Sequence, residues 1–460
     1  MICRPKVIIE KVRVDPGAGP DYIDALSKSI AAIFDAFGGK SLLKSSRAVY
    51  LKPNAIDTKP FVYTRPEFLE RVIDYFKGIG AGRIYVMENS TQSNYTRIVF
   101  DGIGYARICR RTGAIPLYLD EQKNVRMEFS RDPQKAGAYD SNVLEMPRIL
   151  VDKLIDHKDE NLYVNLPKLK THSMGVVTLG IKNQWAFPAQ HVRKHDHNFN
   201  LHSKLVDVLE KIQPDFTLIE GIEGTIHGHY PLVAFHDRTI KPFRLLIGSP
   251  NVLAADIVGA RVFGIPAGEV PSFKIAMERK LCGGIQGLDD IDVDGDLSGY
   301  TTRYDYDIVK DVPPNVNIVK GKSLLCREGC LNNPLMVAQM LRFDYAGRGK
   351  CDLVIGKGHD PAVIDGLQGP VVVAGHCAID EVGQRLRQRL GKAHVFFSDG
   401  CNNLRETSVG LARFMGVNLL KLVPSSAFRS ISLLLQAKLH GTTANVPSIR
   451  EVLTRYKVKY

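Results

Sequence analysis

The sequence lacks any apolar run long enough to cross a membrane. A spanning helix needs about 18 or more consecutive apolar residues, whereas the most apolar segment, Ser430 to Leu439, is about half that length and has Arg429 and Lys438 at its flanks. The opening residues, Met1 to Val12, also hold no apolar stretch of signal-peptide length. We therefore expect a cytoplasmic protein without a membrane span.

The sequence also lacks clustered positive charge, although its formal net charge is +12. An excess of this size fits a nucleic acid, a membrane surface or a small anionic ligand as the partner. The basic residues are spread along the chain with no run of five or more. This dispersion disfavours nucleic-acid binding, which stays as a further alternative, and favours a small anionic substrate.

Cysteine is scarce over most of the chain and concentrated near its end. Of eight cysteines in 460 residues, five lie between positions 326 and 401. In a reducing compartment such clustering indicates metal or redox chemistry before disulfides.

Most of the chain alternates strand-like and helix-like segments, which is typical of an α/β fold with mostly parallel sheets flanked by helices. A polar, turn-rich stretch from Asp289 to Pro314 separates two such regions. Because 460 residues exceed what one core usually supports, we predict two α/β domains, residues 1–305 and 306–460. The first has strands predicted at 7–14, 48–51, 83–87, 162–166, 216–219 and 244–247, and helices at 21–37, 66–79 and 253–263. The second has strands at 351–356, 370–375 and 394–397, and helices at 380–390 and 404–415.

The cysteines of the second region follow predicted strands. Cys377 and Cys401 come just after strands that end at Gly375 and Phe397, and Cys326 and Cys330 form a C-x3-C pair after Leu325. Strands of a parallel sheet end at a common edge, where ligands collect. We therefore predict that these four thiolates hold an iron–sulfur cluster, of the 4Fe-4S type. Inert buried cysteines and a zinc site are the alternatives, and Cys351, at a strand start, is predicted to be structural.

Two short segments around these cysteines resemble known cluster-binding motifs. Gly375-His376-Cys377-Ala378 and Asp399-Gly400-Cys401-Asn402-Asn403 are similar to the G-x-C-A and G-C-P-P segments of the small subunits of nickel–iron hydrogenases and of complex I. Asn402-Asn403 stands where two prolines are usual, and C-x3-C where C-x-x-C is usual. The resemblance is therefore partial, and it implies a four-iron cluster.

A basic, histidine-rich stretch follows the strand at 162–166. Lys168, Lys170 and Lys182 flank a glycine-containing connection that can bring them around one anion, and six histidines lie between residues 191 and 229. His195-x-His197 and His227-x-His229 have a spacing compatible with metal ligands on a strand. A divalent metal at these histidines, contact with a substrate, and a plain solvated loop all remain open.

Several motifs together resemble a known protein family. They are Leu51-Lys52-Pro53-Asn54, Thr64-Arg65-Pro66-Glu67, Asn165-Leu166-Pro167-Lys168-Leu169-Lys170-Thr171-His172, Gly180-Ile181-Lys182-Asn183, Glu220-Gly221-Ile222-Glu223-Gly224 and Ala255-Asp256. Residues 46–300 resemble domain of unknown function family 362. The resemblance implies an uncharacterised protein associated with iron–sulfur proteins, although the ferredoxin-like cysteine segment of many members is missing here.

These observations predict an iron–sulfur oxidoreductase, or a reductase component with an electron-transfer partner protein, that acts on a small anionic organic substrate. His172, Glu88 and Glu223 are the predicted acid–base groups. The predicted substrate-binding residues are Lys52, Asn54, Arg65, Lys168, Lys170, Lys182 and Asn183. A non-redox isomerase or lyase, assisted by a metal at the histidines, is the main alternative.

Overall fold

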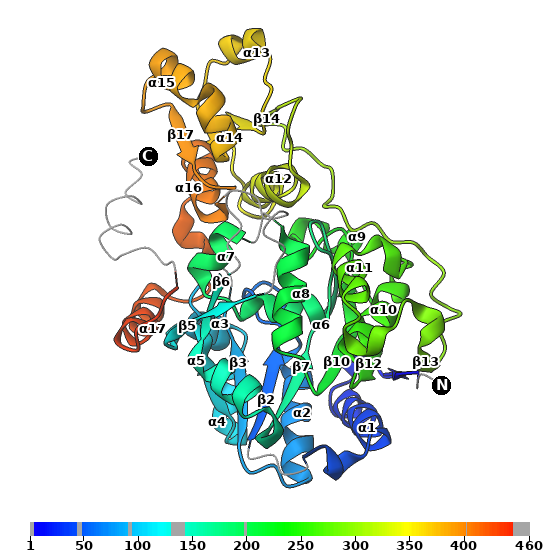
Figure 1. Cartoon of the computed structure of the whole chain (residues 1–460). Helices are drawn as coiled ribbons and strands as arrows, with labels where there is room; N and C mark the ends of the chain where they lie inside the picture. Colours follow the sequence, from blue (N-terminus) through cyan, green and yellow to red (C-terminus); the bar gives the residue numbers. More distant parts are fainter. Residues whose placement is uncertain are drawn as a thin grey trace.

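The computed structural model describes residues 4–43, 48–90, 94–129, 143–196, 200–401 and 403–444. It is an α/β structure built on two sheets, as predicted, with helices on both sides of each (Figure 1). The predicted boundary at residue 305 falls between the last strand of the first sheet and the first strand of the second. No helix within these residues has the length and apolarity of a membrane span.

The first sheet has eleven strands, with the central order β13-β1-β12-β10-β7-β2-β3-β4. From β10 to β4 neighbouring strands are parallel, while β12 runs antiparallel to both β1 and β10. The strands are β1 (Lys6–Lys11), β2 (Ala48–Pro53), β3 (Ile84–Glu88), β4 (Ile115–Tyr118), β7 (Asn161–Leu166), β8 (Lys168–His172), β9 (Val176–Thr178), β10 (Phe216–Thr225), β11 (Ile240–Lys241), β12 (Leu245–Ser249) and β13 (Asp292–Asp294). A separate hairpin pairs β5 (Asn124–Glu128) with β6 (Val143–Pro147).

The central strands β2 and β7 are buried along their whole length, because helices cover both faces of the sheet. Two apolar cores result, one on each side. The helices on one face are α1 (Pro20–Ala36), α2 (Pro66–Gly78), α3 (Thr96–Gly102) and α4 (Tyr105–Thr112). Those on the other face are α8 (Leu201–Lys211), α10 (Val252–Val262) and α11 (Pro271–Glu278). Two short helices, α6 (Gly180–Asn183) and α7 (Gln190–Asp196), lie near the strand ends.

The second sheet is fully parallel, in the order β14-β15-β16-β17. Its strands are β14 (Val316–Lys320), β15 (Cys351–Ile355), β16 (Val371–Ala374) and β17 (Val395–Ser398). Its helices are α12 (Asn333–Gln339), α13 (Pro361–Gly366), α14 (His376–Ala378), α15 (Gln384–Leu390) and α16 (Leu404–Met415). Leu232 and Phe235 of the first region join the core under α12 and α16, so apolar packing connects the two regions.

Two elements differ from the sequence-based expectation. Residues 168–172, for which no strand was predicted, form strand β8, which pairs with β9 and β10. The last helix, α17 (Ala427–Leu439), packs on α3 and adds Leu433, Leu434 and Ala437 to a core of the first sheet. The C-terminal region therefore contributes to both α/β units.

Candidate functional site

The carboxyl ends of β2 and β3 carry a buried ion pair. The Nζ of Lys52 lies 2.9 Å from Oε2 of Glu88, and both side chains are essentially inaccessible to solvent. Glu88 also accepts hydrogen bonds from the backbone N–H groups of Ala55, at 2.7 Å, and Asn89, at 2.8 Å. Because a buried carboxylate needs several donors, these bonds hold the two strand ends and the following loop together.

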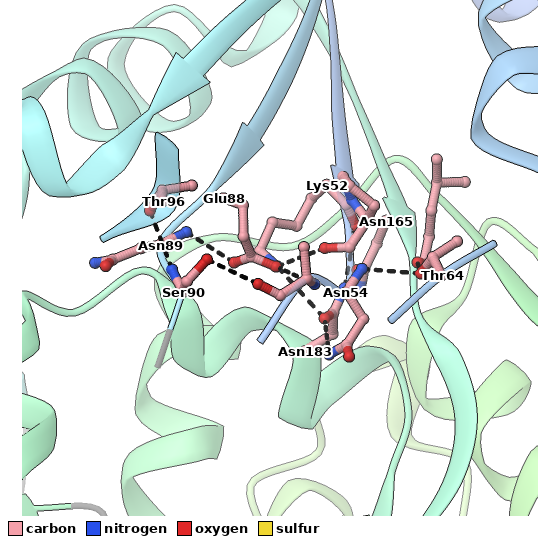
Figure 2. A network of polar contacts seen from close by, with 12 residues as sticks. Lys52, Asn54, Thr64, Glu88, Asn89, Ser90, Thr96, Asn165 and Asn183 are labelled. Atoms are coloured by element: carbon pink, nitrogen blue, oxygen red, sulfur yellow. Dashed lines mark hydrogen bonds and ion pairs between the residues drawn. The ribbon is translucent and has the colours of Figure 1, made fainter. Parts of the chain in front are cut away.

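Asn183 connects this pair to the neighbouring strand ends (Figure 2). Its Nδ2 donates to Oδ1 of Asn165 at 2.8 Å and to the carbonyl of Lys52 at 3.1 Å, and its Oδ1 accepts from Nδ2 of Asn54 at 2.9 Å. Three strands and α6 thus share one polar network, in which the predicted residues Lys52, Asn54, Glu88 and Asn183 come together.

Lys170 extends the network with an amine placed between neutral groups. Its Nζ donates to Oδ1 of Asn54 and to the carbonyl of Val62, both at 2.8 Å. Burial holds the pKa of Lys170 well below its ordinary value, and the positive charges of Lys182 and Lys168 lower it further. An anion at this place would relieve that repulsion.

Lys182 lies near enough to Lys170 for its charge to act on it, and its side chain is half-buried. Burial, with the nearby charge of Arg193, lowers the pKa of Lys182 to about 7. Its amine is thus partly neutral at physiological pH, the state in which a lysine can accept a proton or act as a nucleophile.

A second ion-pair group lies where β8 meets β10. The ammonium of Lys168 lies 2.8 and 2.7 Å from the two carboxylate oxygens of Glu220, and the guanidinium of Arg65 binds Glu223 with two bonds of 3.1 and 3.0 Å. Burial raises the pKa of Glu223, against the opposing charge of Lys168. The predicted residues Arg65, Lys168 and Glu223 therefore lie together, and Glu223 is the better proton acceptor for its raised pKa.

His172 ends β8 in a defined tautomer. Its Nδ1 accepts the backbone N–H groups of Met174, at 3.2 Å, and Gly175, at 3.1 Å, so these two donors assign the proton of the neutral ring to Nε2. The ring stacks on His229 with centroids 3.9 Å apart and planes 3° apart. A Cβ on Gly175 would stand 3.6 Å from Cγ of His172 and 3.5 Å from Cε of Lys182, so these two predicted residues flank the same turn.

The four predicted cysteines all follow strands of the second sheet, at its carboxyl edge. Cys326 and Cys330 come after β14, Cys377 after β16 and Cys401 after β17. Cys330 is buried, Cys326 is exposed, and the other two are intermediate. Cys351 lies in β15, buried in the apolar core, as its predicted structural role requires.

The four thiols are near enough for their charges to act on one another. Burial raises the pKa of Cys330 to about 12, and the charges of Cys326, Cys401 and Cys377 act in the same direction, while a backbone N–H of Gly356 opposes them. Burial also raises the pKa of Cys401, helped by the charges of Cys377 and Cys326. Three strand ends therefore bring these side chains into one neighbourhood.

This cysteine group lies against the first sheet's site. Arg327, next to Cys326, donates from Nε to the carbonyl of Ser173 at 3.1 Å, one residue from His172. The buried ammonium of Lys204, on α8, acts on Cys401 and opposes the rise in its pKa. The cysteines and the His172 turn are thus neighbours across the junction of the two regions.

Within the described residues, no group of three His, Cys, Asp or Glu side chains is arranged to hold one metal ion. That geometry differs from a cluster site, because each cysteine of a four-iron cluster binds a different iron. Of the histidine pairs, His227 and His229 are described, whereas His197 lies outside the described residues.

Sequence reasoning missed several buried charges of the site. Glu220, Arg193, Lys204 and Asp256 are all buried, and Asp256 accepts the N–H groups of Gly180, at 2.6 Å, and Ile181, at 2.8 Å, which begin α6. Their partners come from distant parts of the chain. For Glu220 and Asp256 the available signals were their place in the family motifs and a charged residue within an apolar segment; for Arg193 and Lys204 the sequence offers no such signal.

Comparison with known proteins agrees with the motifs. Thylakoid-associated protein sll1697 of Synechocystis sp. is 25% identical over 270 residues, which is 55% of this chain and 75% of the relative. A crystal structure of a Thermotoga maritima protein aligns with a TM-score of 0.36 and 10% identity, over 85% of this chain and 82% of that one. Residues 49–261, which carry the buried lysine and asparagine network, match the model described as domain of unknown function (DUF362).

Proposed function

We propose that the protein is an iron–sulfur oxidoreductase that acts on a small anionic organic substrate. The observation that carries the proposal is the gathering of four cysteines from three strand ends beside the His172 turn. When bound, a 4Fe-4S cluster supplies or removes single electrons. An electron-transfer partner protein would complete the exchange.

The surroundings of the thiols fit such a group. Gly356 directs an N–H at the sulfur of Cys330, the kind of bond that stabilises cluster sulfur. At Gly375 an added Cβ would come within 3.0 Å of the Cys330 sulfur, whereas at Gly400 it would meet nothing within 4 Å. Small residues therefore leave room next to Cys330 and Cys401.

The basic groups of the first sheet suit an anionic substrate. Lys52 and Lys168 are each paired with a carboxylate, whereas Lys170 donates to neutral oxygens under the influence of Lys182. A carboxylate or phosphate would be attracted to this positive corner. Lys182 is only half-buried, so it is more accessible than Lys170.

In this proposal the protein's own groups position the substrate and move its protons. Lys170 and Lys182 bind the anion, and Asn54 and Asn183 hold Lys170 and Lys52 in place. His172, with its proton on Nε2, and Glu223, with its raised pKa, exchange protons with the substrate. The cysteine group lies next to the same turn, so electrons and protons would be delivered to one place.

Anaerobic purification tests the cluster. We expect a brown protein with about four irons and four sulfides per chain, whose visible absorption bleaches on reduction. Cys326→Ser, Cys377→Ser and Cys401→Ser should each lose most of the iron and sulfide, while the matched control Cys351→Ala keeps them. A colourless wild-type protein without acid-labile sulfide would refute the proposal.

Thermal stabilisation by anions tests the substrate site. Phosphate and a panel of small carboxylates should raise the melting temperature of the wild-type protein, because a ligand that binds only the folded state stabilises it. Lys170→Met, alone or with Lys168→Met, should abolish this shift, while the exposed Lys438→Met retains it. An unchanged shift in Lys170→Met would remove Lys170 from the site.

A further inference from the structure

The last described helix, α17, is apolar on two opposite faces. Leu433, Leu434 and Ala437 are buried against the first sheet's core. Phe428 and Leu439 are each 86% exposed, and Ile431 and Leu435 are each 47% exposed. An amphipathic helix normally buries its apolar side chains against a neighbour, but no other described residue covers the outer apolar face of α17.

The exposed residues form one continuous stripe. Phe428, Ile431, Leu435 and Leu439 are spaced three, four and four residues apart, which is the repeat that places side chains on one side of a helix. Figure 1 shows α17 at the periphery of the molecule, beside α3. The stripe is therefore presented outward along the full length of the helix.

Positive charge flanks this stripe at both ends. Lys421, before the helix, and Lys438, in its last turn, are both exposed. An apolar helix face with basic flanks is the pattern of a helix that lies in a membrane interface.

We propose that the outer face of α17 docks on an anionic lipid surface. The apolar stripe would enter the boundary between headgroups and acyl chains, and the basic residues would contact the headgroup phosphates. A second copy of the chain is the less suitable occupant, because pairing two such faces would bring two sets of like charges together in a protein whose net charge is already +12.

Vesicle co-sedimentation tests the proposal with the purified full-length protein. We expect binding to vesicles of phosphatidylglycerol and phosphatidylcholine that is at least tenfold stronger than binding to phosphatidylcholine alone, and that weakens as salt is raised. Phe428→Ser with Leu439→Ser should reduce it at least tenfold. Both side chains are exposed, so the variant should keep the wild-type melting temperature.

A matched control replaces exposed apolar residues elsewhere. Val312 and Val363 are 52% and 47% exposed, and Val312→Ser with Val363→Ser should bind vesicles as the wild type does. Absence of binding to anionic vesicles, or equal binding by the Phe428→Ser, Leu439→Ser variant, would overturn the proposal. A wild-type dimer that the same variant converts to a monomer in light scattering would also overturn it, in favour of a second copy.

Discussion

At the scale of single residues, the site is dominated by charges that are buried in pairs. Lys52 and Glu88 are fully enclosed, so neither can exchange its partner for water. Removing one member of such a pair leaves the other charge uncompensated, which costs far more than the pair contributes. Each charged member of the polar network is therefore needed to compensate the charge of its partner.

We predict that Glu88→Gln lowers the free energy of unfolding by about 3 to 5 kcal/mol. The change leaves the Lys52 ammonium facing a neutral amide, and it also weakens the acceptor for the Ala55 N–H. Urea unfolding at neutral pH measures the loss. Lys28→Met removes the exposed Lys28–Asp24 pair and should leave stability almost unchanged; similar losses in both variants would contradict this account.

Lys182 should react with amine reagents at unusually low pH. Its pKa is lowered to about 7 by burial and by Arg193, whereas an ordinary lysine titrates near 10.4. We predict that acetylation of Lys182, followed by mass spectrometry, is half-maximal near pH 7, whereas the lysine of a model peptide follows the ordinary curve. Arg193→Gln should move the Lys182 midpoint upward, and identical curves for Lys182 and the model peptide would be inconsistent with this environment.

At the scale of elements, Asp256 on α10 determines where α6 begins. Both of its carboxylate oxygens accept N–H groups at the start of α6, and burial raises its pKa to about 7. The same carboxylate thus fixes the position of Asn183, which lies on α6 and joins the strand ends.

We predict a pH-dependent contribution from Asp256. Because its folded-state pKa lies above its unfolded value, the folded state binds more protons, so this stabilisation is full below about pH 4 and is lost as pH rises to about 7. The loss is at most about 4 kcal/mol. The loss is measured by comparing the unfolding free energies of the wild type and Asp256→Asn between pH 4 and 8. The difference between the two proteins should change with pH, and a constant difference would disprove the pKa shift of Asp256.

The elements themselves could largely be predicted from the sequence. Strands such as β2 and β7 are short apolar runs, and helices such as α1 and α16 carry a clear apolar periodicity, so local composition is enough to find them. Strand β8 is not among the predicted strands, because Lys168 and Lys170 interrupt its apolar pattern. Their burial depends on Glu220 and Asn54, which no local pattern reveals.

At the scale of the whole molecule, the two sheets present their carboxyl edges near a common junction. The sequence predicted that the cysteines collect at one edge, since Cys377 and Cys401 follow two neighbouring parallel strands and the Cys326–Cys330 pair follows an apolar segment. It did not predict that Arg327 would reach Ser173 or that Lys204 would lie near Cys401. Such contacts depend on how the two regions pack, which is a property of the assembled surfaces.

The return of α17 to the first sheet is a second feature of the whole molecule. Besides its apolar contacts, Ser430 accepts a hydrogen bond of 2.6 Å from the hydroxyl of Tyr95, and Arg429 pairs with Asp101 of α3. Helix α17 therefore stabilises the first α/β unit, although the residues that it contacts there lie more than 300 positions earlier in the sequence.

The single tryptophan allows this dependence to be measured. Trp185 is buried in the first region, so its fluorescence follows the unfolding of that region alone. We predict that Leu433→Ala, which opens space between α17 and α3, lowers the stability reported by Trp185 by about 2 kcal/mol.

Leu435→Ala, on the exposed side of the same helix, is the matched control and should leave the Trp185 transition in place. If α17 instead belonged only to the second region, Leu433→Ala would shift the unfolding seen by circular dichroism and leave the tryptophan transition unchanged. A shift in the tryptophan signal that is specific to the buried leucine therefore shows that the first sheet's stability depends on residues from the end of the chain.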